Sequence, residues 1–565
     1  MGCWLMLLPV AIALSIIPAC NGVRDVPEAV KQCHTSDFLR PASATHLHQD
    51  SEFLSDRSYG ESEAQQVHVT LGGPGEAVVV YATKDYEAES VVRFGTEEGS
   101  LDSIATGDKR TYTVRVCPEP FAHMNPMPGP AKNELSLVET IALQNTSQWL
   151  PAESAAYHEV HGPEDVVLGC WPYFNNNSFY ESPTIHTVRL KNLAPSTTYH
   201  YTCGTQPTRS FKFTMPPAVG PEVPLRVGLW ADVGQSNISA INARNQMEYN
   251  ADINLLAGDL SYADGVPWRW DSWGRLMQPL LSEHLHLFCP GNHDIASGSE
   301  QGVAYTERYP SPWRSSGSSS PLWYSIDIGP MHLISLAGSY SPIGPYTAQR
   351  RWLEKDLVAV DRSVTPWLVV MWHVPWYNSN ENHRLEAEPM RKEIEDLLVD
   401  ARVNLVINGH VHSYERSHPM VNFKHDDCGP VHVVVGDGGN YEGPALPWRN
   451  EQPEWSAFRE GSYGTGSLEI ESSQRAVWRW RRRACVTKQS GMLDVWTHLW
   501  NATYYVKAGD AKGDCATSGD NAEMMHAAVD EFVMQQHPAH CSRRSRSSPG
   551  AFQPDSETNS ISTSK

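Results

Sequence analysis

Five apolar segments in the middle of the chain each end on polar side chains of the kinds that bind metal ions. The runs at 225–231, 253–257, 285–288, 367–372 and 403–407 are followed, in that order, by Asp232, by Asp259 and Tyr262, by Asn292-His293-Asp294, by His373, and by His410 and His412. Short apolar runs of this kind fit buried strands, and the strand ends of an α/β sheet converge on one crevice. An aspartate after a strand is often a helix cap, and an isolated histidine is often a core residue. Five such endings in succession predict one site instead.

The donor set indicates two metal ions. Two carboxylates, a phenol, an amide and three imidazoles make seven ligands, which suits two ions better than one. Asp259 can bridge both ions with its two carboxylate oxygens. Two metal ions a few ångströms apart stabilise an in-line displacement at phosphorus and lower the pKa of the attacking water. The pattern therefore predicts hydrolysis of a phosphate ester.

The ordered motifs resemble those of the purple acid phosphatases, a subgroup of the calcineurin-like metallophosphoesterases. They are Asp232-x-Gly234, Gly258-Asp-x-x-Tyr262, Gly291-Asn-His293, Val370-x-x-His373 and Gly409-His-x-His412. Generic members of the larger group carry Asp-x-His at the first motif. Here Gly234 replaces that histidine, and Tyr262 supplies the missing ligand. Segments such as His373-Val-Pro-Trp-Tyr-Asn378 and Gly436-Asp-Gly-Gly-Asn440 are similar to the large plant-type enzymes, so the resemblance covers roughly residues 63–485.

The resemblance implies an acid phosphatase that hydrolyses phosphate monoesters by attack of a metal-activated hydroxide. It implies Fe(III) on Asp232, Asp259, Tyr262 and His412, and a divalent ion (Zn, Mn or Fe) on Asp259, Asn292, His373 and His410. Phenolate coordination to iron would give a purple colour. Asn292, His293 and His410 would bind the substrate, and the catalytic residues would be His293 and the proton donor His383. Some relatives place two adjacent histidines where this chain has Asn382-His383, so the leaving-group preference stays open.

A proline-rich segment at 215–224 divides the chain. Before it, short alternating runs predict an antiparallel, fibronectin-III-like β-sandwich over residues 63–217. After it, strands alternate with helix-compatible segments such as 349–358 and 388–399, which predicts an α/β metallophosphoesterase domain over 222–485, with β-sheets layered with helices in βαβ units. Residues 486–540 are predicted to be a C-terminal extension with a peripheral helix from about Asp520 to Pro538. Residues 22–62 are predicted to be irregular, and the Ser-rich residues 541–565 to be a disordered tail.

The first 21 residues predict a secretory signal peptide, because an apolar run of about 16 residues is followed by small residues. An uncleaved anchor is the alternative, but the run is short of the ~20 residues that span a bilayer. Nine of the 11 cysteines follow this segment, none in a CxxC pair, so disulfides are expected and at least one thiol is free or pairs with another chain. Glycosylation sequons occur at Asn145, Asn176, Asn237 and Asn501. Together with the signal peptide and the cysteines, these sequons predict a glycoprotein that is secreted or held in the secretory-pathway or vacuolar lumen. No membrane span is expected once the signal is removed.

A formal net charge of −21 disfavours nucleic acid as a specific partner, whereas small phosphorylated substrates remain compatible because a metal reverses the charge locally. The resemblance also suggests a homodimer, for which no single residue is diagnostic. Two other functions stay open. One is a phosphodiesterase or nucleotide pyrophosphatase on the same site. The other is a cell-surface binding protein with a vestigial metal site, against which the presence of all seven ligands argues.

Overall fold

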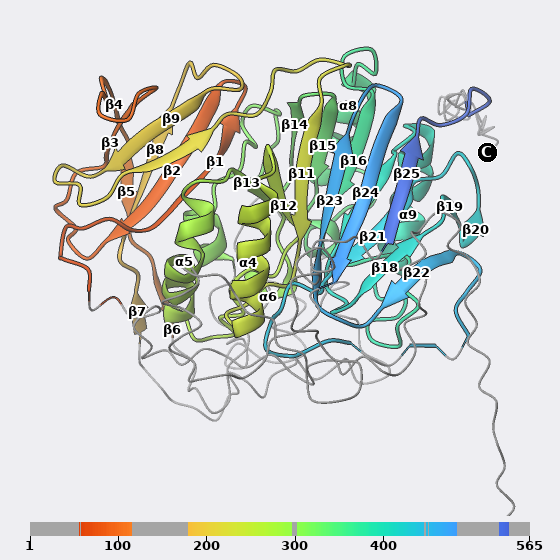
Figure 1. The fold of residues 1–565 in the computed structure, drawn as a ribbon. Helices are drawn as coiled ribbons and strands as arrows, with labels where there is room; N and C mark the ends of the chain where they lie inside the picture. The colour runs from red at the N-terminus through yellow and green to blue at the C-terminus, as the bar shows by residue number, and fades with distance from the viewer. Residues whose placement is uncertain are drawn as a thin grey trace, which may run out of the picture.

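The computed structural model describes residues 56, 58–115, 179–295, 302–445, 448–449, 451–482 and 530–541. Its N-terminal part is a sandwich of two antiparallel sheets, and the remainder consists of two larger sheets with helices against their outer faces (Figure 1). This architecture confirms the predicted β-sandwich followed by an α/β domain. The predicted signal peptide, nearly all of the irregular N-terminal segment and all of the predicted tail except Cys541 lie outside the described residues.

The N-terminal sandwich is built from short strands that pair antiparallel. One sheet contains β1 (Gln65–Gly73), β2 (Glu76–Thr83), β5 (Asp108–Arg110) and β8 (Thr184–Leu190), and the other contains β3 (Val91–Gly95), β4 (Ser103–Thr106), β9 (Thr198–Cys203) and β10 (Phe211–Thr214). A small pair, β6 (Thr113–Arg115) with β7 (Phe179–Glu181), lies beside them. Tyr199 and Tyr201 both point into the sandwich core, as the alternation in β9 predicts.

The second part contains two sheets. One is formed by β11 (Leu225–Trp230), β12 (Ile253–Leu256), β13 (His286–Phe288), β23 (Gly464–Ile470), β24 (Arg475–Arg482) and β25 (Asp530–Gln535). The other is formed by β14 (Tyr324–Ile328), β15 (Met331–Ser335), β16 (Trp367–Met371), β17 (Leu405–Asn408), β21 (Val431–Val435), β18 (Tyr414–Ser417) and β22 (Ser456–Glu460). A hairpin, β19 (Met420–Val421) with β20 (Lys424–His425), follows β18.

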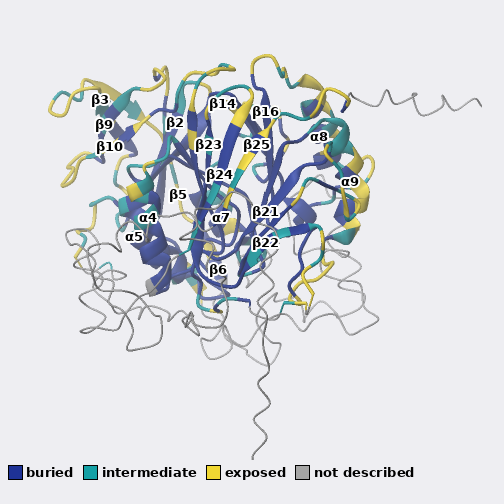
Figure 2. Ribbon diagram, turned by 45° about the vertical axis from the view of Figure 1, so that its right-hand side comes forward, coloured by how far each residue is buried: buried dark blue, intermediate teal, exposed yellow. Residues whose placement is uncertain are grey.

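Helices pack on these sheets. They are α4 (Asn237–Tyr249), α5 (Trp268–Leu281), α8 (Ala348–Ala359) and α9 (Glu388–Asp400), with the shorter α6 (Asn292–Ile295), α7 (Val303–Arg308) and the 3₁₀ turn η2 (Gly338–Tyr340). The helices α8 and α9 confirm the two helical segments predicted from sequence. Both faces of the central strands are buried (Figure 2): in β16, Trp367 and Val369 belong to the core shared with the other sheet, and Val370 to the cluster that includes α9. Burial on both faces explains why these strands read as continuous apolar runs.

The two parts of the chain share one sheet and a buried ionic network. Strand β1 pairs parallel with β13 through Thr70 and His286, which joins the N-terminal sheet to that of β11–β13 as a single ten-stranded sheet. Arg308, which is 2% exposed, donates to Gln66 Oε1 on β1 at 2.6 Å and to Asp271 Oδ1 on α5 at 2.8 Å. The N-terminal sandwich is therefore bonded to the second part of the chain, rather than tethered by the proline-rich segment alone.

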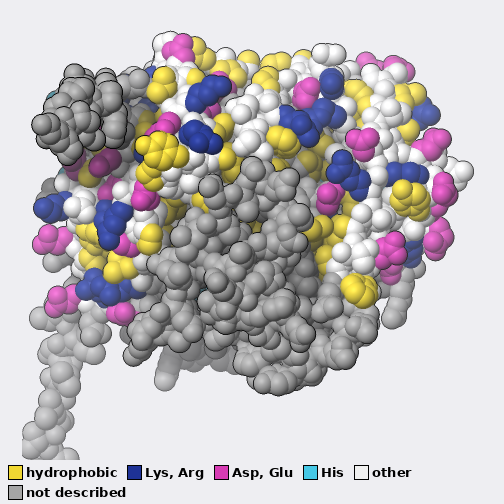
Figure 3. Space-filling model, turned by 180° about the vertical axis from the view of Figure 1, so that it is seen from behind, with side chains coloured by type: hydrophobic (Ala, Val, Ile, Leu, Met, Phe, Trp, Pro, Cys, Tyr) yellow, Lys and Arg dark blue, Asp and Glu magenta, His cyan; other side chains and the backbone are white. Residues whose placement is uncertain are grey.

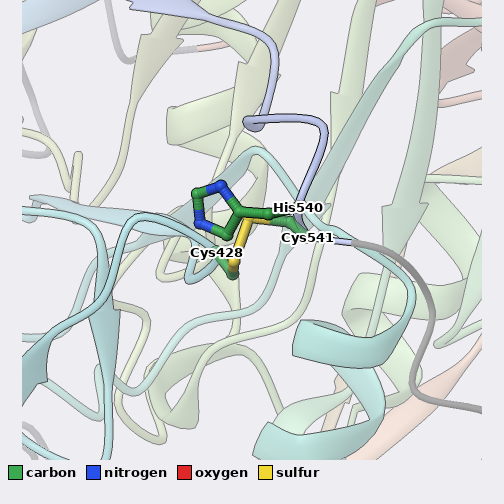
Figure 4. Close-up of side chains that lie close together, drawn as sticks. All are labelled: Cys428, His540 and Cys541. Atoms are coloured by element: carbon green, nitrogen blue, oxygen red, sulfur yellow. A yellow bond between two sulfur atoms is a disulfide. The ribbon is translucent and has the colours of Figure 1, made fainter.

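The prediction of a helix near the C-terminus is wrong for those residues of the segment that the structure describes. Residues Asp530–Gln535 form β25, an edge strand that pairs antiparallel with β24. The segment ends in a disulfide between Cys541 and Cys428 (Figure 4). His540 lies beside that disulfide, but both sulfurs are bonded to each other, so these three side chains do not form a metal site. Cys203 and Cys289 are free and buried.

The described surface mixes charges of both signs. On the rear face, Lys and Arg side chains alternate with Asp and Glu, without a large basic patch among the described residues (Figure 3). In the part of the chain that the structure describes, no helix has the length and apolarity required to cross a bilayer.

Candidate metal centre

The structure brings all seven predicted ligands together at one end of the two sheets. Asp232, Asp259 and Asn292 follow β11, β12 and β13 of one sheet, whereas His373 and His410 follow β16 and β17 of the other. The sequence suggested five consecutive strand–helix units, but the ligands come from two facing sheets. The residues that turn away from the strands adopt left-handed backbone angles, with φ of +56° at Asp232 and at Asp259. Such angles are strained for non-glycine residues and cluster at functional sites.

Tyr262 lies between Asp232 and His412. Its phenol oxygen donates to Asp232 Oδ1 at 3.0 Å and lies 3.0 Å from His412 Nε2, while His412 Nε2 is 3.4 Å from the same Asp232 oxygen. Gly234 makes room for this ring: a Cβ at position 234 would lie 3.4 Å from Tyr262 Cδ2 and 3.0 Å from Asn440. The glycine and the tyrosine of the two motifs are thus linked by packing.

A second group of donors surrounds Asp259. His373 Nε2 lies 2.9 Å from Asp259 Oδ2 and 3.8 Å from Asp232 Oδ1, and His410 Nδ1 lies 2.9 Å from Asn292 Oδ1. Asp259, His373 and His410 are all buried and could hold a metal ion together. His373 thus contacts an aspartate of each group of donors.

The arrangement of these donor atoms suits coordination of a metal ion better than hydrogen bonding among themselves. Asp259 Oδ2 and His373 Nε2 are buried, yet neither has a hydrogen-bond partner of acceptable geometry. The other nitrogen of His373, Nδ1, bonds to the Ala257 carbonyl at 2.7 Å, which leaves Nε2 as the unprotonated donor once that bond fixes the tautomer. Neighbouring ligands of an octahedral ion with bonds of about 2.1 Å lie about 3 Å apart. The spacings of 2.9–3.4 Å among these donors match that value.

The charges of the site favour a cation, which would take the place of the protons that the protein alone keeps on His373 Nε2 and on the Tyr262 phenol. Burial disfavours the charged imidazolium of His373, but Asp259 and Asp232 outweigh it and raise its pKa to about 9. Burial and the neighbouring Asp232 raise the pKa of Tyr262 well above that of an ordinary phenol. The protein alone therefore keeps the phenol protonated, and a highly charged cation is needed to make a phenolate ligand of it.

His293 is held in one orientation. Its Nδ1 lies 2.5 Å from Asp264 Oδ1, and its ring stacks on Tyr262 with centroids 4.2 Å apart. Burial opposes protonation of His293, but Asp264 and Asp259 raise its pKa well above the usual value. The result is a cationic side chain beside the donor cluster.

His383 reaches the site from the loop before α9. Its ring lies 4.0 Å from that of His410, and Glu386 Oε2 contacts both histidines, at 2.8 Å from His383 Nδ1 and 3.1 Å from His410 Nε2. His383 is 43% exposed in its side chain, in contrast to the buried donors. The structure thus brings His383 to the solvent-facing side of the site.

Three family descriptions match successive parts of the chain. The purple acid phosphatase N-terminal domain matches residues 64–215, the calcineurin-like phosphoesterase residues 225–414, and the iron/zinc purple acid phosphatase-like protein C residues 429–490. Purple acid phosphatase 18 of Arabidopsis thaliana is 42% identical over 308 residues, which are 54% of this chain and 69% of that protein. The chain belongs to the purple acid phosphatases.

Another relative agrees with this assignment, and a solved structure shares the fold. A purple acid phosphatase of Glycine max is 37% identical over 390 residues, covering 63% of this chain and 82% of the relative. The structure of purple acid phosphatase PPD1 from yellow lupin (Lupinus luteus) shares the fold, with a TM-score of 0.56 and 22% identity over 74% of this chain and 72% of that one. The protein is a phosphatase that hydrolyses phosphate monoesters at a binuclear metal centre.

Sequence reasoning missed the residues that orient the predicted side chains of this purple acid phosphatase. Asp264 holds His293, Glu386 holds His383 and His410, and Tyr340 donates to Asn292 Oδ1 at 3.2 Å. Asp264 follows Tyr262 by two residues, and Glu386 follows His383 by three, so proximity in sequence was a usable signal for both. Tyr340 offered none, because it comes from a turn between strands of the other sheet.

Proposed function

We propose that Fe(III) binds to Asp232, Asp259, Tyr262 and His412, and that a divalent ion binds to Asp259, Asn292, His373 and His410. The contact of the Tyr262 phenol with both Asp232 and His412 carries this proposal, since a phenolate and two carboxylates suit a hard trivalent ion. Zn, Mn and Fe all suit the second group of ligands. The bound ions would polarise the phosphoryl oxygens and lower the pKa of the attacking water.

The side chains around the centre take the remaining roles. Asp264 holds the His293 ring through Nδ1, and His293 would contact the phosphate beside the substrate-binding residues Asn292 and His410. His383 uses Nδ1 for Glu386, so Nε2 is the nitrogen that gives a proton to the leaving-group oxygen. Burial opposes the ionised form of Glu386, but the His410 and His383 imidazoles that contact its Oε2 lower its pKa, which keeps it an acceptor for both rings.

Metal analysis combined with a visible spectrum tests the ligand assignment. The purified protein should contain about one iron and one divalent metal per chain and should absorb in the visible range. Tyr262→Phe should abolish or shift this absorption while much of the hydrolysis survives, because Asp232, Asp259 and His412 remain. A colourless wild-type protein without iron would rule out the ferric assignment.

The reaction class is tested by assaying nitrophenyl phosphate and its bis ester side by side. A purple acid phosphatase acting on monoesters should favour the first by a large factor in kcat/KM. A preference for the bis ester would favour a phosphodiesterase on the same metal site.

We also propose that the protein is exported and glycosylated. The apolar N-terminus supports export, and the sequons at Asn145, Asn176 and Asn501 support glycosylation, although all of these lie outside the described residues. The sequon at Asn237 is a weaker candidate, because its Ser239 hydroxyl is buried and donates to the Val233 carbonyl. Expression in a eukaryotic secretory system, with mass spectrometry of the mature N-terminus and of the glycopeptides, tests both.

A further inference from the structure

The loop between β16 and α9 carries His383 on an exposed tip with strained backbone angles. Residues 371–380 are all buried, whereas residues 381–386 are all exposed. His383 and Leu385 have φ of +55° and +61°, angles that non-glycine residues keep only when the surrounding structure holds them there. Because the tip is exposed, hydrogen bonds rather than core packing must hold it.

Two buried side-chain amides bond to the peptide groups that precede His383. Asn378 Nδ2 donates to the Asn382 carbonyl at 2.7 Å, and Asn380 Oδ1 accepts the Asn382 N–H at 3.0 Å. The two amide-bearing residues are also joined to each other, because Asn378 Oδ1 accepts the Asn380 N–H at 2.8 Å. Asn378 and Asn380 are 6% and 0% exposed. Both backbone polar groups of Asn382 are thus bonded to buried side chains, which sets the direction in which the chain enters His383.

Asn380 also connects this loop to the metal centre. Its Nδ2 donates to the Ala445 carbonyl at 3.0 Å, and the Ala445 N–H donates to the His412 carbonyl at 2.7 Å. His412 is one of the proposed ligands of the ferric ion. A continuous series of hydrogen bonds therefore runs from the backbone of a proposed metal ligand to the peptide group that precedes His383.

The base of the loop has separate anchors. Glu415 Oε2 accepts the Ser379 N–H at 2.8 Å, and Glu415 Oε1 accepts the Ser379 hydroxyl at 2.5 Å. The Arg449 N–H donates to the Ser379 carbonyl at 3.2 Å. Removing the amide of Asn378 should therefore leave the base of the loop in place and release only the tip that carries His383.

We propose that Asn378 and Asn380 are positioning residues that hold His383 at the distance from the metal centre at which it protonates the leaving group. This inference rests on the proposed role of His383 as the proton donor. Proton transfer requires a donor within about 2.6–3.2 Å of the leaving-group oxygen, and a displacement of about 1 Å can cost about 100-fold in rate. An alkoxide leaving group needs this proton, whereas nitrophenolate leaves with little assistance. Loss of either amide should therefore slow alkyl phosphates selectively.

The test is Asn378→Ala in the metal-loaded, full-length protein, assayed with an alkyl phosphate and with nitrophenyl phosphate. We expect kcat to fall by about 10- to 100-fold for the alkyl phosphate and by less than about threefold for nitrophenyl phosphate, with unchanged KM and metal content. Asn380→Ala removes the other amide and should show the same selectivity, so the result does not depend on the folding of one variant. Equal losses for both substrates, loss of metal or unchanged rates in either variant would overturn the proposal.

Asn404→Ala is the matched control. Asn404 is 5% exposed, and its amide also joins separate segments: Oδ1 accepts the Leu368 N–H at 2.9 Å, and Nδ2 donates to Gln536 Oε1 at 3.2 Å. Asn404 precedes β17, at the end of the strand opposite His410. Both rates should change by less than about twofold. A selective loss of alkyl phosphate hydrolysis in this variant would mean that any buried amide has the effect, and would also overturn the proposal.

His383→Ala separates failure of this inference from failure of the proposed function. In the His383→Ala background, Asn378→Ala should lower kcat for the alkyl phosphate by less than about a further twofold, because the group that it positions is absent. An undiminished loss there would overturn the inference. If His383→Ala alone causes no selective loss, the proposed role of His383 fails and the inference falls with it. If His383→Ala causes that loss but Asn378→Ala does not, only the inference about the two asparagines is wrong.

Discussion

The carboxylate of Asp294 accepts the backbone N–H of Asp259 at 2.7 Å. The same Oδ2 atom accepts Gly291 N–H at 2.9 Å, and Oδ1 accepts Leu260 N–H at 2.9 Å. Asp294 is buried and follows Asn292 by two residues, so it joins the loop that carries Asn292 to the loop that carries Asp259. One carboxylate thus sets the distance between two proposed ligands that follow different strands.

Asp294→Asn should lower metal affinity by about 10- to 100-fold, as loss of supporting hydrogen bonds at metal sites does. An amide brings an NH₂ group toward three N–H donors, so at least one donor loses its acceptor. The check is metal content after dialysis against a graded series of chelator concentrations. Asp252→Asn is the control, because Asp252 precedes the same strand, β12, and also accepts a backbone N–H, that of Arg226 at 2.7 Å. Equal metal loss in both variants would contradict the role of Asp294.

His383→Ala should reduce kcat by about 10²–10⁴-fold, the usual contribution of general acid catalysis. Metal content should stay intact, because His383 lies outside the seven donors and Glu386 keeps its contact with His410. The loss should be largest for substrates with poor leaving groups, such as alkyl phosphates, and smallest for nitrophenyl phosphate. His425→Ala, at another exposed histidine, serves as the control and should retain full activity. A uniform loss across leaving groups would argue against proton donation by His383.

His332 gives the fold a dependence on pH that is separate from catalysis. Its Nδ1 lies 2.5 Å from Asp327 Oδ1 and its Nε2 lies 3.0 Å from Asp356 Oδ2, which ties β15 to β14 and to α8. Burial disfavours the imidazolium, but the two aspartates raise the pKa of His332 to about 9. The protonated His332 stabilises the folded protein, and this stabilisation is complete when the pH is below about 6.5, the pKa of a histidine in the unfolded chain. It is lost as the pH rises through about 9, the pKa in the folded state.

His332→Gln should therefore lower the free energy of unfolding by roughly 2–4 kcal/mol at pH 5–6, and by much less at pH 10. Urea unfolding of the wild-type protein and of the His332→Gln variant across this pH range, followed by tryptophan fluorescence, measures the difference. A difference that does not change with pH would show that His332 contributes through packing rather than through its charge.

The strands, and the residues that gather at the site, could be predicted from sequence because each is coded locally. The apolar runs of β11, β12, β16 and β17 are buried on both faces except at Arg226 in β11, and the proposed ligands follow within a few residues. Asp264 and Glu386 also lie close to predicted residues, but their partners become apparent only when the loops are folded. The arrangement of the ligand strands in two facing sheets, and the pairing of β1 with β13, depend on contacts between segments far apart in sequence.

The C-terminal strand shows why such contacts override local preference. The segment around Asp530 has an apolar spacing that also fits a helix, and the sequence alone predicts one there. In the folded chain, β24 offers an unpaired edge, and Arg416 offers a buried cation to Asp530. Backbone pairing along six residues and one buried ion pair outweigh a weak helical preference.

Asp530→Ala should destabilise the protein by about 3–5 kcal/mol, because it leaves the charge of Arg416 buried without a partner. Asp530 is fully buried, its two oxygens accept from Arg416 at 2.7 and 2.8 Å, and Oδ2 also accepts the Tyr414 hydroxyl at 2.6 Å. Glu531→Gln is the matched control, since Glu531 pairs with Arg479 at 2.7 Å on the exposed face of the same strand and should contribute less than about 1 kcal/mol. Urea unfolding measures both changes. Equal effects of the two substitutions would mean that β25 is held by its backbone pairing and the disulfide, and not by the buried ion pair.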